Sequence, residues 1–485
     1  MDSQEKLKEF EPIFSPLSIA IAGASENEGK MGTMMLKNFL KAGFKGRLYP
    51  VNPGGGSTLG LRIYSRIRDI PGPVDYVIVA IPADYVLDLV DDCAIKGVKA
   101  IQFFSAGFSE TGHEAGIRLE HDMLARARKA DLRIIGPNCV GVSCPARGIP
   151  VPSTGGIGSA GPIGFLSQSG GHTETLADLG CARSIRFSKL ISFGNGCDLN
   201  EIDFLEYLAV DPETRIVGAY LEGGRNGRRV FQLIRDIAGS KPMIVWKGGE
   251  TGVGREIAAS HTGSLAGSDT LWEAAIRQAG AIQVKTLEEL ADTFLAFQNI
   301  PHLLGNRTGI ISQLGGGAGG VAVSASDVCT WHGLEIPCLS GKSRKRLRSV
   351  IKGAGTILRN PFDLGMAGRF PHVLADVLKI LEDDPNVDFI MVNERIDFFL
   401  FFSSMTEINE LNDTLIAFKK GSRKPLVVVS SPIAADAERL SIEKKLLQAD
   451  IPVYPSFERA AKAVSNVYQY RMGSTGITGL DPDLP

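Results

Sequence analysis

Residues 18–40, which read SIAIAGASENEGKMGTMMLKNFL, decide the fold of the amino-terminal part of the chain. The segment from Ser18 to Gly23 is short and apolar, as expected for a buried parallel strand. After a glycine-containing turn, methionine and leucine recur at helical spacing from Lys30 to Leu40. This order of strand, turn and helix predicts one repeating unit of a parallel α/β sheet.

The same alternation continues along the chain. Further strands are predicted at residues 46–51, 74–81, 100–104 and 132–135, with helical patterns between them. Right-handed crossovers would bring the turns after these strands to one carboxyl edge of the sheet. In α/β proteins this edge is where ligands bind.

Two further sheets follow. A segment rich in Pro, Gly and Ser at residues 145–162 indicates a linker. Strands are then predicted at 163–166, 189–193, 216–221 and 242–246, and again at 309–312, 389–393 and 425–429. We therefore expect three successive Rossmann-like or flavodoxin-like α/β domains at residues 1–148, 149–304 and 305–472, with a loose polar tail at 473–485.

The composition narrows the classes of function. Hydrophobic residues make up 44% and charged residues 22%, which is typical of a soluble globular protein. A net charge of −2 gives no electrostatic basis for binding nucleic acid. No apolar run reaches the roughly 18 residues of a membrane span, and the polar first residues favour a cytoplasmic protein. The seven cysteines form no Cys-x-x-Cys pair, so we expect no metal site.

The first turn, residues 23–32, lacks the Gly-x-Gly-x-x-Gly fingerprint of dinucleotide sites. The second strand ends at Asn52-Pro53, where an NAD site would carry an acidic residue for the ribose. Both departures argue against NAD. Lys30 near a helix N-terminus still suits a nucleotide that bears phosphate, although a purely structural turn is the alternative reading.

Three elements of the second domain suggest phosphate chemistry. Ser169, Gly170 and Gly171 stand at a strand-to-helix turn, where backbone amides can hold phosphate. Glu222 ends another strand, and His261 lies in a run of small residues that we expect to be a loop. If the strands are parallel neighbours, these groups converge on one edge. The alternatives are a plain turn, a solvated carboxylate and a surface histidine.

Six motifs in order carry a resemblance to a known family. They are Gly136-Pro137-Asn138-Cys139-Val140-Gly141, Ser167-Gln168-Ser169-Gly170, Gly194-Asn195-Gly196 with Asp198, Tyr220-Leu221-Glu222-Gly223-Gly224, Lys241-Pro242, and Ser260-His261-Thr262-Gly263. From about Ser15 to Arg471 the chain resembles the α-subunit side of the nucleoside-diphosphate-forming acyl-CoA synthetases, the superfamily of succinyl-CoA synthetase. The third segment, with residues 360–364 and 451–454, is similar to the additional domain of the ADP-forming acetyl-CoA synthetases.

The resemblance implies a role for each candidate residue. His261 would be phosphorylated, Glu222 would support it, and Ser169 with the amides of Gly170 and Gly171 would cradle the phosphate. A neutral imidazole is the nucleophile toward phosphorus, and a carboxylate on its far nitrogen stabilises the cation that forms. In the first domain, the positions that match residues near coenzyme A in the family are Gly23, Ala24, Ser25, Lys30, Gly32, Pro53, Pro82, Ser105 and Asn138.

The chain departs from the family pattern at two places. Residues 54–56 are all glycine, where relatives often carry a lysine that contacts coenzyme A. His172 stands where related turns usually carry a small residue, and we expect it to line the acyl pocket or to be an exposed residue at a helix start.

The sequence lacks a phosphate-binding loop of the form Gly-x-x-x-x-Gly-Lys-Ser/Thr and any segment resembling an ATP-grasp domain. In the family that domain belongs to a β-subunit, which implies an ATP-grasp partner, an α2β2 assembly, and ATP or ADP with Mg²⁺ on the partner. The implied function is acyl-CoA synthesis through acyl phosphate and phosphorylated His261. The alternatives are a non-catalytic, coenzyme A-binding regulatory protein, or an acyl-CoA transferase or exchanger that works without an ATP-grasp subunit.

Overall fold

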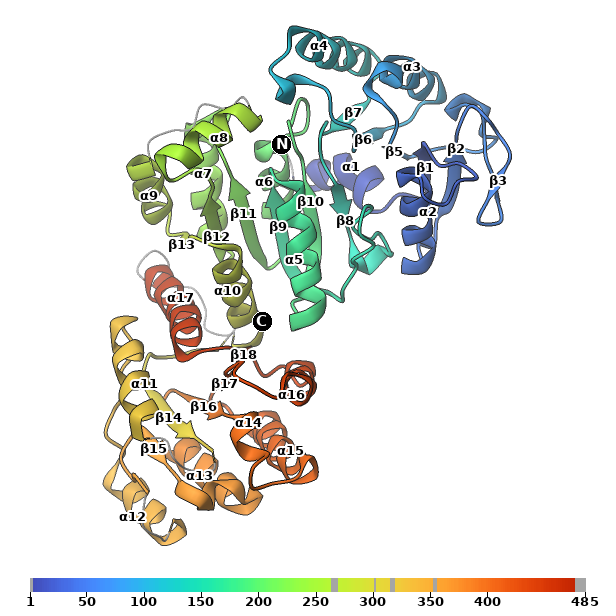
Figure 1. Ribbon diagram of the computed structural model, residues 1–485. Helices are drawn as coiled ribbons and strands as arrows, with labels where there is room; N and C mark the ends of the chain where they lie inside the picture. The colour runs from blue at the N-terminus through green and yellow to red at the C-terminus, as the bar shows by residue number, and fades with distance from the viewer. Residues whose placement is uncertain (1–2, 263–268, 301, 315–318, 352–355, 476–485) are drawn as a thin grey trace. The chain divides into compact units, whose positions relative to one another are not determined.

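The computed structural model describes residues 3–262, 269–300, 302–314, 319–351 and 356–475, and for residues 258–262 and 474–475 it describes the backbone alone. The chain forms two compact units, Met1–Leu290 and Ala291–Pro485. Within the described ranges, two large sheets lie in the first unit and one in the second, and nearly all strand pairs are parallel (Figure 1). The predicted fold class, successive parallel-sheet α/β layers, is confirmed.

The first sheet has the strand order β2-β1-β5-β6-β7. Its strands are β1 (Ser18–Ala22), β2 (Arg47–Val51), β5 (Tyr76–Val79), β6 (Ala100–Phe103) and β7 (Arg133–Ile135), joined by α2 (Met31–Ala42), α3 (Val86–Lys96) and α4 (Glu114–Lys129). A ribbon of β3 (Ser57–Thr58) and β4 (Leu61–Arg62) follows β2, and short 3-10 helices lie at η1 (Ile67–Asp69), η2 (Ala83–Tyr85) and η3 (Ser109–Thr111). The central strands are fully buried because helices cover both faces.

The second sheet has the order β13-β12-β11-β9-β10-β8. Its strands are β8 (Gly141–Ser143), β9 (Ala160–Ser167), β10 (Phe187–Ser192), β11 (Ile216–Leu221), β12 (Met243–Lys247) and β13 (Ile282–Val284). The accompanying helices are η4 (Pro145–Arg147), α5 (Gly170–Arg183), α6 (Glu201–Val210), α7 (Gly227–Ala238), α8 (Gly252–Thr262), α9 (Asp269–Gln278) and α10 (Leu287–Asn299), which extends into the second unit.

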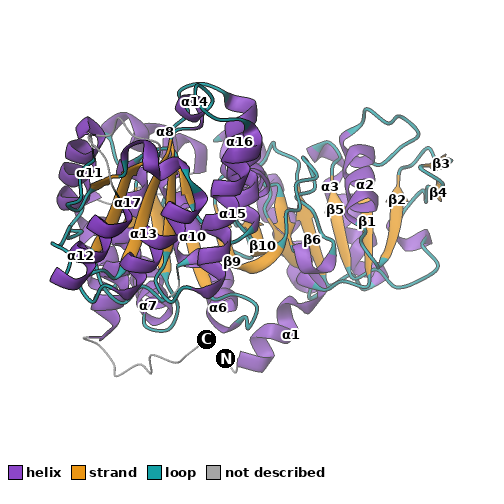
Figure 2. Ribbon diagram, turned by 90° about the horizontal axis from the view of Figure 1, so that it is seen from below, coloured by secondary structure: helices purple, strands orange, loops and turns teal. Residues whose placement is uncertain are grey.

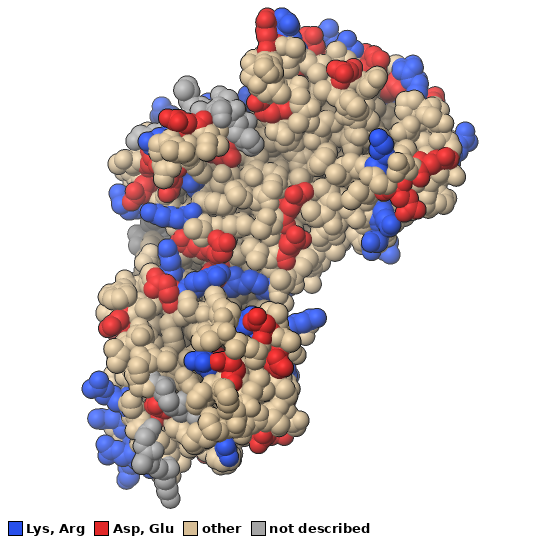
Figure 3. Space-filling view, in the orientation of Figure 1, with Lys and Arg blue, Asp and Glu red and all other residues tan. Residues whose placement is uncertain are grey.

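The third sheet has the order β15-β14-β16-β17-β18. Its strands are β14 (Thr308–Gln313), β15 (Phe362–Asp363), β16 (Phe389–Glu394), β17 (Leu426–Ser430) and β18 (Val453–Tyr454). Its helices are α11 (Gly319–Trp331), α12 (Gly341–Val350), η5 (Gly365–Arg369), α13 (Pro371–Asp383), α14 (Ile396–Phe399), α15 (Met405–Gly421), α16 (Asp436–Gln448) and α17 (Phe457–Thr475). On α12 the basic side chains Lys342, Arg344, Lys345 and Arg348 face solvent, and Lys and Arg gather there in Figure 3.

The first two sheets are joined by elements that cross between them. Helix α1 (Ser3–Phe14) precedes the first sheet but packs on α6 of the second, beside which it lies in Figure 2. Phe14 stacks on Tyr207 with the ring centroids 4.6 Å apart. Strand β8 follows β7, the last strand of the first sheet, but pairs antiparallel with β10 of the second. Arg133, at the start of β7, holds Asp198 of the second layer at 2.9 Å. These joints explain why the two sheets form a single compact unit.

Some local expectations differ from the structure. The small-residue run expected to form a loop is helical as far as Thr262, because α8 already begins at Gly252. Thr251 Oγ1 accepts a hydrogen bond from the amide of Gly254 at 3.1 Å, as an N-cap does, so the glycine-rich run is the start of a helix. The expected loose tail is helical to Thr475, and residues 476–485 lie outside the described residues. The predicted domain boundaries stay predictions.

A buried acid lies at the carboxyl end of β16 in the third sheet. Glu394 is 1% exposed and accepts a hydrogen bond from Asn412 Nδ2 at 2.7 Å. Burial raises the pKa of Glu394 from 4.5 to about 7, against the smaller lowering effects of the Asn412 amide and the Lys445 charge. The carboxyl group is therefore close to half protonated at neutral pH.

This shift predicts that the second unit loses stability as the pH rises from about 4.5 to about 7. Below that window Glu394 is protonated in the folded and unfolded states, and above it folding must bury a charge, which costs about 3 kcal/mol for a shift of this size. In Glu394→Gln the amide keeps an acceptor for Asn412, and urea unfolding should reveal a variant more stable than wild type at pH 8 and nearly equal at pH 5. Glu410→Gln, at an exposed position of α15, is the matched control. Equal pH profiles for wild type and Glu394→Gln would contradict the assignment.

Candidate active site

The carboxyl edge of the second sheet contains a topological switch between the neighbouring strands β9 and β11. Helices α6 and α7 pack against each other on one face of this sheet, whereas α5, which follows β9, covers the other (Figure 1). Chains that leave adjacent strands in opposite directions open a crevice between them. Ser169 follows β9 and Glu222 follows β11, so both stand at this crevice.

Ser169 is the N-cap of α5. It has an extended backbone, and its Oγ accepts a hydrogen bond from the amide of His172 at 3.3 Å. The first-turn amides of a helix have no acceptor within the helix and carry the positive end of its dipole. A Cβ on Gly171 would meet open space, whereas one on Gly170 would lie 3.1 Å from the side chain of Val140. The turn is thus open at Gly171, where its backbone is accessible, and it packs tightly against Val140 at Gly170.

Glu222 is held from three sides and is 6% exposed. Its amide and that of Gly223 both donate to Gln168 Oε1, the latter at 3.2 Å. Tyr220 Oη donates to Glu222 Oε1 at 3.2 Å, and Lys247 Nζ donates to the Glu222 carbonyl at 2.8 Å. Because both ends of the residue are fixed, the carboxylate has a defined position at the switch.

His172 lies in the first turn of α5 between these two groups. Its ring packs against those of Tyr220 and Trp246, with centroids 4.7 Å and 4.5 Å away. Burial lowers the pKa of His172, and the negative charge of Glu222 opposes this effect. The imidazole is therefore a half-buried, neutral ring at neutral pH, and the reading of an exposed helix-start histidine is not supported.

His261 lies in the last turn of α8, and its side chain is outside the described part of the structure. The helix packs against η3 of the first sheet, so its backbone lies in the same unit as the switch. Arg255 of α8 forms an ion pair with Asp269 at the start of α9. The role of His261 stays a prediction.

The turn after β1 depends on two glycines that approach each other closely. Gly23 has a φ of +102°, and a Cβ there would lie 2.3 Å from the carbonyl oxygen of Ala80. A Cβ on Gly32, in the first turn of α2, would lie 2.4 Å from the carbonyl carbon of Gly23. Thr33 Oγ1 accepts from the amide of Ser25 at 2.9 Å and closes the turn. The helix N-terminus is thereby brought to the strand end.

The other expected coenzyme A contacts follow the remaining strands of the same sheet. They share one carboxyl edge: Ala24, Ser25 and Lys30 after β1, Pro53 after β2, Pro82 after β5, Ser105 after β6 and Asn138 after β7. Lys30 is exposed at the N-cap position of α2, whereas Ala24 is fully buried and can offer a ligand only its backbone. The amide of Asn138 donates to the carbonyl of Ser105 at 3.0 Å, which ties two of these turns together.

The glycine run at residues 54–56 lies against an acid. Glu26 Oε1 accepts from the amide of Ser57 at 3.3 Å, and a Cβ on Gly56 would come within 2.4 Å of the same oxygen. A carboxylate therefore occupies the space beside Gly56, and a side chain at this position would have to displace it.

Two residues inside the quoted motifs were missed as contributors. Gln168, between two serines, is the acceptor that joins β9 to the start of the Glu222 turn. Asn195 Nδ2 donates to Glu110 Oε2 at 2.6 Å and to Glu120 Oε2 at 2.9 Å, which links the second sheet to η3 and α4. An amide flanked by small residues after a strand is the signal that could have identified both.

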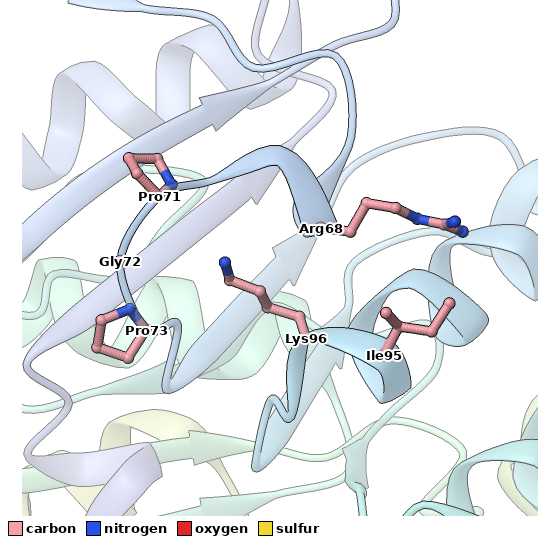
Figure 4. Close-up of a pocket in the computed structure, with 6 residues that line it drawn as sticks. All are labelled: Arg68, Pro71, Gly72, Pro73, Ile95 and Lys96. Carbon is pink, nitrogen blue, oxygen red and sulfur yellow. The ribbon is translucent and has the colours of Figure 1, made fainter.

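A separate hollow lies at the opposite, amino edge of the first sheet (Figure 4). Its basic side chains serve local contacts: Arg68 pairs with Asp92, and Lys96 donates to the carbonyl of Ile70. In the described ranges no group of three or more His, Cys, Asp or Glu residues could hold a metal ion. Over those same ranges no helix combines the length and apolarity needed to cross a bilayer.

Comparisons with known proteins agree with this arrangement. Residues 17–145 match the model of the CoA binding domain, and residues 160–297 match that of the succinyl-CoA ligase like flavodoxin domain. The chain is 34% identical over 473 residues to the alpha subunit of ADP-forming acetate–CoA ligase I of Pyrococcus furiosus, covering 95% of this chain and 97% of that one. It is also 34% identical over 375 residues to the ADP-forming 4-hydroxybutyrate–CoA ligase of Nitrosopumilus maritimus, covering 76% of this chain and 53% of that protein.

A solved structure extends the match to the fold. The dinucleotide forming acetyl-coenzyme A synthetase 1 of Ca. Korarchaeum cryptofilum, in complex with phosphate and ADP, superposes with a TM-score of 0.82 at 30% identity, covering 96% of this chain and 97% of that one. Since sequence and fold agree over nearly the whole chain, the protein belongs to the ADP-forming acyl-CoA ligases, a family of acid–thiol ligases that includes the alpha subunits of acetate–CoA ligase.

Proposed function

We propose that this chain is the coenzyme A-binding, phosphohistidine-carrying subunit of an ADP-forming acyl-CoA synthetase. The enzyme would interconvert acyl-CoA, ADP and phosphate with the free acid, coenzyme A and ATP. The observation that carries the proposal is the Gln168 bridge, which holds the helix cap Ser169 and the acid Glu222 at one switch point. A phosphate site and an orienting carboxylate are the two elements that a phosphohistidine needs.

In the first step, inorganic phosphate at the N-terminus of α5 attacks the thioester carbonyl. The C–S bond breaks, coenzyme A leaves as its thiolate, and acyl phosphate forms. The Ser169 hydroxyl and the amides of Gly170 and Gly171 would hold the phosphate oxygens, where the helix dipole favours negative charge.

In the second step, the neutral imidazole of His261 attacks phosphorus. The bond from phosphorus to the acyl oxygen breaks, the carboxylic acid leaves as its anion, and phosphorylated His261 remains. Glu222 would accept the hydrogen bond of the other ring nitrogen, which fixes the tautomer and stabilises the cationic ring.

The third step requires a second protein. Phosphorylated His261 would pass its phosphoryl group to ADP on an ATP-grasp β-subunit, which would also supply Mg²⁺ to neutralise the nucleotide phosphates. Two relatives from Pyrococcus furiosus are named alpha subunits, and the chain spans 49% of the ADP-forming acetate–CoA ligase of Methanocaldococcus jannaschii. A separate partner that corresponds to the remaining half fits these lengths, and we expect an α2β2 assembly.

Coenzyme A would bind along the carboxyl edge of the first sheet. Lys30 and the N-terminus of α2 offer positive charge to its phosphates, and the turns that carry Pro53, Pro82, Ser105 and Asn138 would line the rest. The acid Glu26 beside Gly56 weakens the positive potential at one end of this edge.

The first functional prediction concerns phosphate transfer. With radiolabelled ATP and the cognate ATP-grasp subunit, wild type should acquire an acid-labile, alkali-stable label that His261→Ala lacks. Glu222→Gln should slow labelling by about 10²-fold, because an orienting acid or base contributes that order of rate. His121→Ala, at a side chain that is 80% exposed on α4, is the matched control and should label normally.

Each rival has its own outcome in this experiment. Coenzyme A binding without label under any pairing indicates a regulatory protein. Acyl exchange between thiols that needs neither ATP nor His261 indicates a transferase. Labelling of His172 instead of His261 would contradict the assignment of His261 as the phosphorylated residue.

A second functional prediction concerns the coenzyme A turn. Gly32→Ala places a methyl group against backbone atoms of Gly23 and Ala24 at 2.4–2.6 Å, so the turn must open. We expect at least tenfold weaker coenzyme A binding by calorimetry and a stability loss of about 1–3 kcal/mol. Gly29→Ala meets only the Asn27 side chain, at 3.3 Å, and serves as the control. Equal affinity of the two variants for coenzyme A would show that coenzyme A does not bind at this turn.

A further inference from the structure

Three aromatic rings lie together beside the switch point of the second sheet. Tyr220 and Trp246 are register partners on β11 and β12, so their side chains leave the same face of the sheet, and their centroids are 4.5 Å apart. His172 of α5 closes the triangle at 4.7 Å from Tyr220 and 4.5 Å from Trp246. We call His172, Tyr220 and Trp246 the ring cluster.

The ring cluster spans the distance between the helix cap and the acid. At one end the amide of His172 donates to Ser169 Oγ at 3.3 Å. At the other end Tyr220 Oη donates to Glu222 Oε1 at 3.2 Å. A group that contacts both the first turn of α5 and Glu222 therefore also lies next to these rings. Gly171, in the same turn as His172, borders open space.

The burial of the three rings differs. Tyr220 is 7% exposed and its hydroxyl lies close under Gly248, where a Cβ would come within 2.4 Å of it. His172 and Trp246 are of intermediate exposure, so part of each ring faces outward. The cluster thus has a packed base, Tyr220, and two partly open aromatic surfaces.

The charges around the ring cluster are unfavourable for a second anion. Glu222 is the charged group that acts on His172. The nearby ammonium of Lys247 is 1% exposed and donates to the carbonyl oxygens of Glu222 and Gly248, and it lies over the ring of Trp272 at 5.6 Å. Two of its protons are therefore used by buried carbonyl oxygens.

We infer that the ring cluster is the wall against which the acyl group lies, and that it selects monocarboxylic acids with an aromatic or branched apolar acyl group over dicarboxylic acids. This inference rests on the proposed function, because it needs the acyl phosphate to form between Ser169 and Glu222. Apolar groups gain by covering the open ring faces, and stacked aromatic pairs gain further through their ring edges. A second carboxylate would face the negative charge of Glu222 beside the rings.

The test measures acid specificity in the complex with the ATP-grasp subunit. Values of kcat/KM for phenylacetate, isobutyrate, acetate and succinate would be compared at saturating coenzyme A and ATP. Wild type should prefer phenylacetate to acetate and use succinate worst. Trp246→Leu and His172→Leu should each lower the ratio of phenylacetate to acetate about tenfold, since apolar contacts of this size discriminate by that order.

Two further variants keep the test informative. Trp246→Phe retains an aromatic face and should keep most of the preference for phenylacetate over acetate. It therefore tests the role of the ring cluster even if Trp246→Leu does not fold. Trp331→Leu, at a side chain that is 75% exposed on α11, is the matched control and should match wild type. Labelling of His261 from ATP is measured in each variant as well, so that a change in acid preference is distinguished from a loss of phosphate transfer.

The outcomes separate this inference from the proposed function. Absence of ligase activity and of His261 label in wild type would refute the function itself. Normal labelling with the same order of acids in all variants, or a wild type that favours succinate, would overturn the role of the ring cluster and leave the function standing.

Discussion

The second sheet depends on one hydrogen-bonding side chain, that of Gln168. Its carbonyl oxygen accepts the amides of Glu222 and Gly223, and it therefore fixes the end of β11 to the end of β9. A buried amide that loses such an acceptor pays its full desolvation penalty, on the order of 1–3 kcal/mol, so the bridge is costly to break. The positions of the helix cap Ser169 and of the acid Glu222 both depend on this bridge.

A comparable constraint acts between the first two sheets. Asn195 reaches two carboxylates of the first sheet's connections, and Gly194 fits where a Cβ would lie 2.3 Å from the carbonyl oxygens of Pro137 and Asn138. The two sheets are thus joined both by close backbone contact and by a shared side-chain amide. The edge proposed to hold coenzyme A and the edge with the switch point therefore belong to one compact unit.

Much of this unit could be predicted from sequence, because the strands of a parallel sheet are short apolar runs with polar residues at their ends. The runs ending at Gly23 and Glu222 were located to within a residue or two. The helical state of Ser260 to Thr262 could not be predicted, because a Thr251 cap outweighs local glycine content. The ring cluster was also out of reach, since it depends on the register of β11 against β12, which no local pattern specifies.

Helix α1 and strand β8 stand before and after the first sheet in sequence, yet both pack into the second. In the sequence, the first sheet is thus flanked by two segments that pack against the second sheet. A recombination point or a fusion junction near residue 150 would leave the second sheet without its edge strand and without the aromatic contacts of Phe10 and Phe14. Separating the two sheets would therefore remove contacts that the second sheet uses, although each sheet has a family model of its own.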